Sequence, residues 1–251
     1  MNQRTRRPDI PRPLARKLRQ EVHFVCPFCN DPLLTYHHII PWREEHHFRE
    51  ADMIALCLKH AHEADNKAIS MERLYNAKKN PPNKRKIRDR FTIADWSRFT
   101  IAVGSCLFQN CRTVLQVQGR QVIGFTNQAG MPALFVDMHD NAGNQLLRIE
   151  ENDWLVNPDN LWDCWVQGHR ITVRDKSERY YIDYRVNAQT STVSINFRIH
   201  SDGVDSSASK HELVIGGLNT TCRGLQFEDL TSAITLTQNV KGQWQTTFGI
   251  P

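Results

Sequence analysis

The chain has 251 residues, of which 40% are hydrophobic and 24% charged, and its formal net charge is +5. This length and composition suit two modest globular domains. No apolar run approaches the roughly 18 residues of a membrane-spanning helix, and the Arg- and Pro-rich start lacks the apolar stretch of a secretory signal, so we expect no membrane segment.

The cysteines indicate the redox compartment of the protein, and the distribution of charge indicates its partners. The seven cysteines are an odd number, and four of them (Cys106, Cys111, Cys164 and Cys222) are scattered. This pattern favours a reducing cytoplasm over a disulfide framework. Residues 1–100 carry 20 Lys and Arg against 12 Asp and Glu, whereas residues 101–251 carry 12 against 15. Net charges of +8 and −3 predict nucleic-acid contact through the first half, although a charge run alone more often marks a solvated surface.

The first half is predicted to alternate short helices with a cysteine-containing turn. Leu14, Leu18 and Val22 recur every four residues and predict a helix over 11–22. A β-hairpin is expected around Cys26–Asn30, followed by short strands to residue 40 and a polar loop over 43–52. A helix from Cys57 to about Asn66 precedes a second one that Ser70 caps and that ends before Asn80.

The second half is predicted to be all-β. Strand-length runs punctuated by turn residues begin after residue 96, and the alternation of polar and apolar side chains over 180–186 is typical of a strand. Such spacing favours an antiparallel sandwich or barrel. The basic segment 84–90 is interpreted as a linker and Ser201–Lys210 as a flexible loop. The Trp and Tyr residues of this half either line a ligand groove or, as is more usual, fill the core: Trp154, Trp162, Trp165, Tyr180, Tyr181 and Tyr184.

Two close pairs of metal-ligand residues stand out in the basic half. Cys26 and Cys29 form one C-x-x-C pair, Cys57 and His60 form a C-x-x-H pair, and 27 residues separate the pairs. A closed Cys₃His set of this spacing predicts a structural zinc site, which a module with so thin a core needs. The alternative is two coincidental pairs.

A pair of adjacent histidines lies between these two ligand pairs. His37 and His38 precede Ile39-Ile40-Pro41-Trp42, and Met53-Ile54-Ala55-Leu56 runs into Cys57. With the two ligand pairs, residues 11–81 resemble the HNH endonuclease family, in the subgroup whose ββα-metal core is braced by a zinc knuckle. The resemblance covers a little under a third of the chain. The fold class predicted is therefore α+β: a zinc-braced HNH module over 1–95 and an antiparallel β domain over 96–251 for regulation, specificity or dimerisation.

The resemblance also implies roles for individual residues. His38 matches the general base that activates water, a role suited to an imidazole near neutral pH. His37 matches a ligand of the catalytic divalent ion, Mg²⁺ or Mn²⁺. Asp52 falls where the family has an asparagine that holds the loop and orients the base. His46 and His47, in the polar loop, are interpreted as ordinary core or surface residues without a catalytic role.

The pattern departs from the family at Ala61, where a histidine is expected to complete the catalytic metal site. His62 follows, but one residue turns a helix by about 100°, so it cannot simply substitute. Three explanations are open: an irregular helix that lets His62 reach the ion, a relic that binds without cutting, or an engineered replacement of a toxic nuclease's ligand. We favour the third and expect this chain to cleave weakly or not at all.

The function predicted is metal-dependent hydrolysis of double-stranded DNA, in bacterial defence or restriction. Alternatives are a catalytically dead nucleic-acid-binding protein and a zinc module whose β domain recruits a partner. Further partners predicted are a second copy in a homodimer and a regulatory ligand or protein bound by the β domain. The residues expected to contact phosphates are Arg12, Arg16, Lys17, Arg19, Lys84, Arg85, Lys86 and Arg88.

Overall fold

A computed structural model describes residues 8–83, 85–91, 96–128, 131–140, 142–159, 161–175, 180–201, 204–216 and 220–250. The chain forms two compact units, Met1–Lys84 and Arg85–Pro251. We describe each unit by itself. The sequence had placed the division after residue 95, so the second unit begins earlier than predicted.

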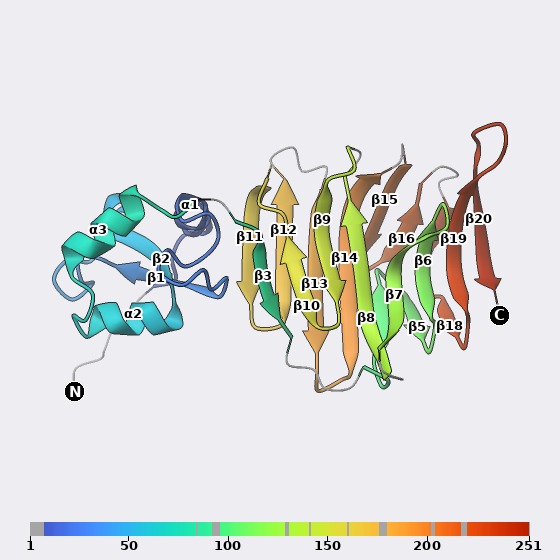
Figure 1. Ribbon diagram of the computed structural model, residues 1–251, viewed down its shortest axis with the longest axis horizontal. Coiled ribbons are helices and arrows are strands. Elements are labelled where there is room, and N and C mark those ends of the chain that lie inside the picture. The colour runs from blue at the N-terminus through green and yellow to red at the C-terminus, as the bar shows by residue number, and fades with distance from the viewer. Residues whose placement is uncertain are drawn as a thin grey trace. The chain divides into compact units, whose positions relative to one another are not determined.

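The first unit is a two-stranded sheet packed among helices. Its elements are, in chain order, α1 (Arg12–Glu21), β1 (Leu34–His38), the 3₁₀ turn η1 (Glu50–Asp52), β2 (Met53–Cys57), α2 (Leu58–Asp65) and α3 (Met71–Lys79). All five residues of β2 are buried, and they contact α1 and α2. The helices of this unit flank the β1–β2 pair (Figure 1). The predicted helices are thus confirmed to within a residue or two at each end.

The strand pairing in this unit differs from the expected hairpin around Cys26–Asn30. That segment is a compact turn, closed by hydrogen bonds from the Asn30 amide to the Cys26 carbonyl and from the Cys26 amide to the Asp31 carbonyl, both 2.8 Å. β1 instead pairs antiparallel with β2, with His37 opposite Ile54 and His38 opposite Met53. The turn has too few residues to form two strands. The apolar β2 therefore supplies the hydrogen-bonding partner of β1 from further along the chain.

The second unit is built from two sheets. Among the described residues, one sheet holds eight strands in the order β20 (Trp244–Ile250), β19 (Ser232–Gln238), β6 (Thr113–Val117), β7 (Arg120–Gln128), β8 (Met131–His139), β9 (Gln145–Glu150), β10 (Asp153–Val156) and β3 (Ile87–Arg90). The other has the path β11 (Leu161–Gln167), β12 (Arg170–Asp175), β13 (Tyr181–Asn187), β14 (Thr192–Ser201), β15 (Val204–Ser209), β16 (Glu212–Ile215) and β17 (Thr220–Cys222), joined by β4 (Thr100–Val103), β5 (Cys106–Gln109) and β18 (Gln226–Glu228).

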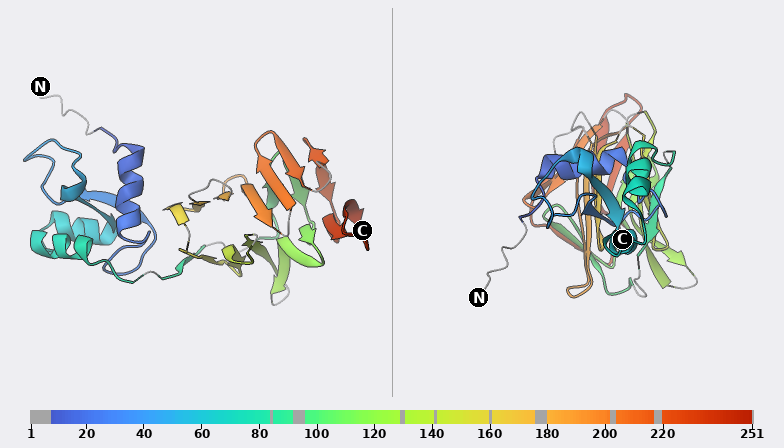
Figure 2. Two further views of the ribbon diagram at one scale, coloured as in Figure 1. Left: turned by 90° about the horizontal axis from the view of Figure 1, so that it is seen from above. Right: turned by 90° about the vertical axis from the view of Figure 1, so that its left-hand side faces the viewer.

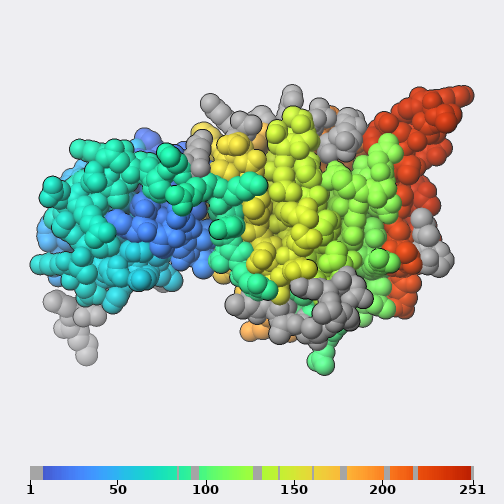
Figure 3. All heavy atoms as spheres, viewed as in Figure 1, coloured from blue at the N-terminus to red at the C-terminus, as the bar shows by residue number. Residues whose placement is uncertain are grey.

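The two sheets lie face to face, as the left-hand view of Figure 2 shows. Between them lies a cavity of about 20 Å³ lined by Leu115 and Met138 from one sheet and Ile199 and Val204 from the other. Figure 3 shows the outward side of the eight-stranded sheet as a continuous face. The unit is therefore a sandwich, one of the two architectures expected.

The sandwich is largely but not wholly antiparallel. β14 pairs with β4, β18 with β5 and β19 with β6 in parallel. Parallel partners need a crossover between them, so these pairs join segments that are distant in the sequence. The alternation of polar and apolar residues along one strand does not reveal which distant strand it pairs with.

Two segments interpreted as irregular are strands. Ile87–Arg90, in the predicted linker, is β3, which pairs antiparallel with β10 and buries Ile87 completely. Val204–Ser209, in the predicted flexible loop, is β15, which alternates buried Val204, Ser206 and Ala208 with more exposed residues. Small and hydroxylated side chains hide this alternation in the sequence. The neighbouring strands β14 and β16 supply the pairing.

Candidate metal centre and the adjacent histidine pair

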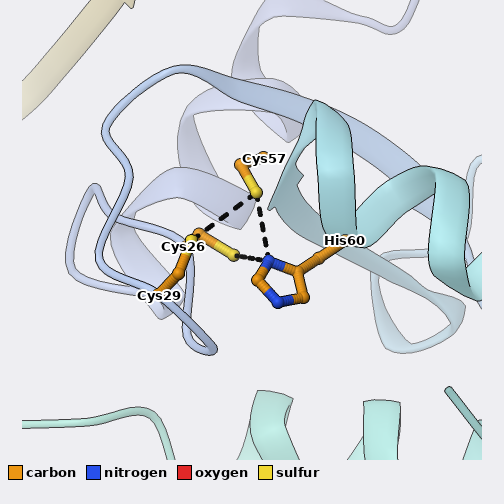
Figure 4. A group of neighbouring side chains, drawn as sticks. All are labelled: Cys26, Cys29, Cys57 and His60. Carbon is orange, nitrogen blue, oxygen red and sulfur yellow. Dashed lines mark hydrogen bonds between the residues drawn. The ribbon is translucent and has the colours of Figure 1, made fainter.

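Four metal-ligand side chains converge in the first unit. Cys26 and Cys29 lie in the compact turn before β1, whereas Cys57 ends β2 and His60 lies in the first turn of α2 (Figure 4). Their ligand atoms all lie within 4.8 Å of one another. Among the described residues this is the one group of three or more such side chains that could hold a metal ion.

The spacing of the four atoms suits a tetrahedral ion. The Sγ atoms of Cys29 and Cys57 lie 3.6 Å apart, and His60 Nδ1 lies 3.5 Å from Cys26 Sγ and 3.1 Å from Cys57 Sγ. Zinc–sulfur bonds of about 2.3 Å and zinc–nitrogen bonds of about 2.0 Å give tetrahedral edges of about 3.5–3.8 Å. The Cys₃His cluster can therefore bind a metal ion such as Zn²⁺, and the predicted ligand set is confirmed as a cluster.

Burial makes the cysteines depend on a cation. Cys26 is fully buried, and burial raises the pKa of its thiol to about 12, with the neighbouring sulfurs adding to the rise. Burial likewise raises the pKa of Cys29. Thiolates are poorly tolerated here without positive charge, and a bound Zn²⁺ supplies it. A metal ion held by all four of these side chains would have no open coordination position, as in a structural site.

The Cys₃His cluster brings α2 close to the compact turn, and α3 also contacts this turn. The ring of Phe28 lies 5.1 Å from the ring of His60, and the Arg73 guanidinium of α3 lies 5.3 Å above Phe28. α3 begins at the predicted Ser70 cap, whose Oγ accepts a 3.2 Å hydrogen bond from the Arg73 amide. The ligand helix and the capping helix are thus both tied to the cysteine turn.

His38, the predicted general base, is buried at the end of β1 with 4% of its surface exposed. Its Nε2 lies 2.8 Å from the carbonyl oxygen of His47. A carbonyl only accepts, so Nε2 carries the proton, and in the neutral ring Nδ1 is the basic nitrogen. The edge of Trp42 and the ring of Phe48 enclose the imidazole. The orientation and tautomer of His38 are therefore set by the 39–52 loop.

His47 is the residue that sequence reasoning missed. It is 7% exposed, its Nε2 lies 3.2 Å from the Ile40 carbonyl, and its Nδ1 accepts a 3.2 Å hydrogen bond from the Arg49 amide. His47 is thus a buried residue with both ring nitrogens hydrogen-bonded, which fits its interpretation as an ordinary core or surface residue. His46 is exposed and stacks on Trp42, as expected of a surface residue. No local signal separates the two, because their burial depends on how the loop folds back over His38.

His37 faces the last residue of α2. Its Nδ1 lies 3.3 Å from a carboxylate oxygen of Asp65, and its side chain is 10% exposed. Asp65 was not among the predicted site residues. It lies four residues after Ala61 and therefore on the same helix face, a spacing that identifies it in retrospect.

The geometry of α2 decides one of the three explanations for Ala61. The helix runs regularly from Leu58 to Asp65, with Ala61 buried and His62 exposed. The side-chain amide of Asn66 lies 3.0 Å from the His62 ring. His62 therefore does not take the place of a ligand at position 61, and the explanation by an irregular helix is wrong.

Asp52 anchors the loop that follows β1. Its carboxylate accepts a 2.7 Å hydrogen bond from Arg49 and a 2.8 Å bond from the Tyr75 hydroxyl, and these bonds lower the pKa of Asp52. Its backbone carbonyl accepts from the amide of Ile39, the residue after His38. Asp52 thus forms hydrogen bonds with residues near both ends of the loop.

The residues predicted to contact phosphates differ in exposure and lie in both units. Arg12 is exposed and Arg16 partly exposed, but Lys17 pairs with Glu50, and Arg19 is 6% exposed and donates a hydrogen bond to Tyr36. Arg19 therefore belongs to the core of the first unit, and its prediction as a phosphate contact is corrected. The exposed residues Arg85, Lys86 and Arg88 belong to the second unit, and Lys84 lies outside the described residues.

Comparisons with protein-family models, curated proteins and solved structures found no match for this chain. Among the described helices, none is both long and apolar enough to cross a membrane.

Proposed function

We propose that the first unit is a metal-dependent DNA endonuclease of the HNH type. The observation that carries this proposal is the convergence of three features on one β1–β2–α2 unit. These are a Cys₃His cluster joining the strand end to the helix, a buried histidine with a defined tautomer, and a histidine–aspartate pair. This arrangement supports hydrolysis of a phosphodiester bond by a positioned base beside a cation.

His38 acts as the general base in this proposal. With Nε2 donating to the His47 carbonyl, Nδ1 takes the proton from the attacking water. Asp52, Arg49 and His47 are positioning residues, since they hold the loop that supplies this carbonyl. An imidazole is suited to this role near neutral pH.

His37 and Asp65 are the residues that would hold the catalytic divalent ion. Their ligand atoms are 3.3 Å apart on facing elements, and Mg²⁺ sites commonly combine one or two protein carboxylates with water and substrate phosphate. When bound, Mg²⁺ or Mn²⁺ supplies positive charge to the phosphate and to the leaving oxygen. A methyl group at Ala61, on the same helix face, contributes no ligand. We therefore expect weak ion binding and slow or absent cleavage.

Duplex DNA is the proposed substrate. Exposed Arg12, partly exposed Arg16 and the exposed cations Arg85, Lys86 and Arg88 are available for phosphate contacts with little sequence preference. A nuclease followed by a separate β unit suits a regulated bacterial defence or restriction effector in the cytoplasm.

The test is cleavage of supercoiled plasmid by the Ala61→His variant, with Mg²⁺ or Mn²⁺, beside the chain as it stands and an Ala61→His/His38→Ala control. We expect nicking or linearisation that needs both the restored histidine and His38. An Ala61→His protein that is folded and zinc-loaded but leaves the plasmid intact would count against the proposal. Asp65→Asn in the Ala61→His background separates ion binding from folding, because the amide is nearly isosteric with the carboxylate.

One observation favours a second candidate, a nucleic-acid-binding protein that does not cut. Position 61 offers no metal ligand, and His62 is held at Asn66. In that case the Ala61→His variant binds duplex DNA in a salt-dependent way and still fails to cleave it. If neither protein binds nucleic acid, the remaining candidate is a zinc module whose β unit recruits a protein partner.

A further inference from the structure

A basic groove lies on the ten-stranded sheet of the second unit, well apart in sequence from the proposed nuclease residues. It is a hollow of about 620 Å³ over β12–β16. Its lining includes Arg174, Arg198 and Lys210, together with Tyr180 and Tyr181. The volume is that of a site for one small ligand or a short stretch of a longer one.

The strand register assembles the centre of this groove. Tyr181 on β13 is directly opposite Arg174 on β12 and Arg198 on β14, and Arg198 is opposite Ser207 on β15. These residues share the sheet's outward face, because the intervening Val173, Ile182 and Phe197 are buried. The three strands therefore present an arginine, a tyrosine and an arginine side by side.

Among the residues that the structure describes, the acidic neighbours of the groove do not cancel its charge. Arg174, Arg198 and Lys210 are exposed. Glu212, at the groove's edge, accepts hydrogen bonds of 2.8 and 3.2 Å from Arg223. Asp183, the next outward residue of β13, is held by two bonds of 2.7 and 2.8 Å from Arg170. Asp163 on β11 pairs with Arg174 on β12 in the sheet, but it does not line the hollow. The lining is thus locally cationic in a unit whose residues after 100 carry a net charge of −3.

The aromatic residues add a second kind of recognition. The Arg174 guanidinium lies 5.0 Å above the ring of Tyr181. Burial raises the pKa of Tyr181, and the nearby Asp183 carboxylate adds to the rise. Asn196, Ser207 and Ser209 add neutral hydrogen-bonding groups to the same lining. Arginines interleaved with tyrosines on an open sheet match a ligand that has both phosphate and a planar base.

We propose that this groove binds a nucleotide phosphate, that is, a phosphodiester group with its adjoining base. Arg174 and Arg198 contact the phosphate, and Tyr181 stacks with the base. The ligand can be part of a single strand or a free short oligonucleotide, since both carry this chemistry. The groove is a site independent of the proposed nuclease centre.

The test uses the full zinc-loaded chain without added Mg²⁺ or Mn²⁺, and a fluorescein-labelled oligothymidylate as the probe. Binding is followed by fluorescence anisotropy, and ultraviolet crosslinking with mass spectrometry locates the contact. The variants are Arg174→Ala/Arg198→Ala and Tyr181→Ala. Arg185→Ala is the matched control, because Arg185 is an exposed arginine on β13 and the same face but outside the groove. Thermal unfolding confirms that each variant is folded.

We expect the double arginine variant to bind at least about tenfold more weakly, since it loses the charged hydrogen bonds of two arginines to the phosphate. The slope of log affinity against log salt should be shallower by about 1.4, which is two phosphate contacts on a single strand. Tyr181→Ala should also weaken binding, Arg185→Ala should leave it within about twofold, and the crosslink should fall on the peptide with Tyr180 and Tyr181.

Competition distinguishes the two sources of the ligand. If the dinucleotide pTpT displaces the probe as well as unlabelled strand does, the groove takes a short free oligonucleotide. If only the longer strand competes, the groove takes single-stranded nucleic acid. Equal binding by the double arginine variant and the Arg185→Ala control, or crosslinks confined to the first unit, would overturn the proposal. Neither result depends on plasmid cleavage, so this proposal and the nuclease proposal fail separately.

Discussion

At the scale of single residues, the loop from Ile39 to Asp52 decides how the histidine pair is presented. His38 is held through the carbonyl of His47, and His47 is held in turn through its own ring by Ile40 and Arg49. Adjacent histidines in this loop therefore have opposite roles, since His46 is exposed on Trp42 and His47 is buried.

The His47→Ala change tests this assignment. It removes both part-buried ring hydrogen bonds, each of which contributes about 0.5–1.5 kcal/mol, so the change costs about 1–3 kcal/mol in all. We expect the free energy of unfolding of the first unit to fall by that amount in urea titrations. His46→Ala is the matched control and should change it by no more than about 0.5 kcal/mol, as is usual at an exposed site. Equal effects of the two changes would show that His47 has no special structural role.

At the scale of elements, the ligand helix α2 depends on what packs against it. α2 has only eight residues, too few for a stable helix in isolation, so the metal cluster, β1 and β2 must support it. α3 is anchored differently, by its Ser70 cap and by the pairing of Lys78 with Glu21 of α1. α3 is thus stabilised by its N-cap and an ion pair, whereas α2 carries His60 of the Cys₃His cluster.

Substitution at the cap gives the second prediction. Ser70→Ala removes the hydrogen bond from the Arg73 amide, and we expect a loss of about 1 kcal/mol in the unfolding free energy of the first unit. Ser70→Asp keeps an acceptor at the N-terminus of α3 and should be close to the original protein. Chemical denaturation of the three proteins measures this, and a Ser70→Asp protein as unstable as Ser70→Ala would contradict the capping explanation.

At the scale of the whole molecule, the two units differ in what stabilises them. The first has a small core around β2 and a Cys₃His cluster, whereas the second has a broad apolar core between two sheets and, among its described residues, no such cluster. Structural zinc contributes about 10–16 kcal/mol of binding free energy in small domains, which exceeds what so thin a core supplies.

Zinc removal should therefore affect one unit only. On chelation we expect helical circular dichroism to fall and protease to degrade the first unit, leaving a resistant fragment that begins near Arg85. Metal analysis should find one zinc per chain, lost in Cys29→Ser and retained in Cys164→Ser, whose cysteine lies in β11. A first unit that stays protease-resistant after complete zinc removal would argue against a structural role for the cluster.

Much of the first unit could be predicted from the sequence because its signals are local. Ligand pairs three residues apart, apolar residues four apart in α1 and the Ser70 cap each depend on neighbours along the chain, and the structure has all three. The alternation of core and surface side chains likewise predicted several strands of the sandwich, including β13 and β14. What the sequence by itself determined was thus the Cys₃His cluster, the helices and the β character of the second half.

Only the tertiary structure decided the features that depend on partners distant in the chain. β3 joins the second unit by pairing with β10, β15 is a strand because β14 and β16 flank it, and three strand pairs are parallel. The same holds for buried His47, for Asp65 beside His37, and for the arginine–tyrosine–arginine row of the groove. The physical reason is common to all of them: burial and hydrogen bonding across a fold are set by contacts between segments that no local pattern specifies.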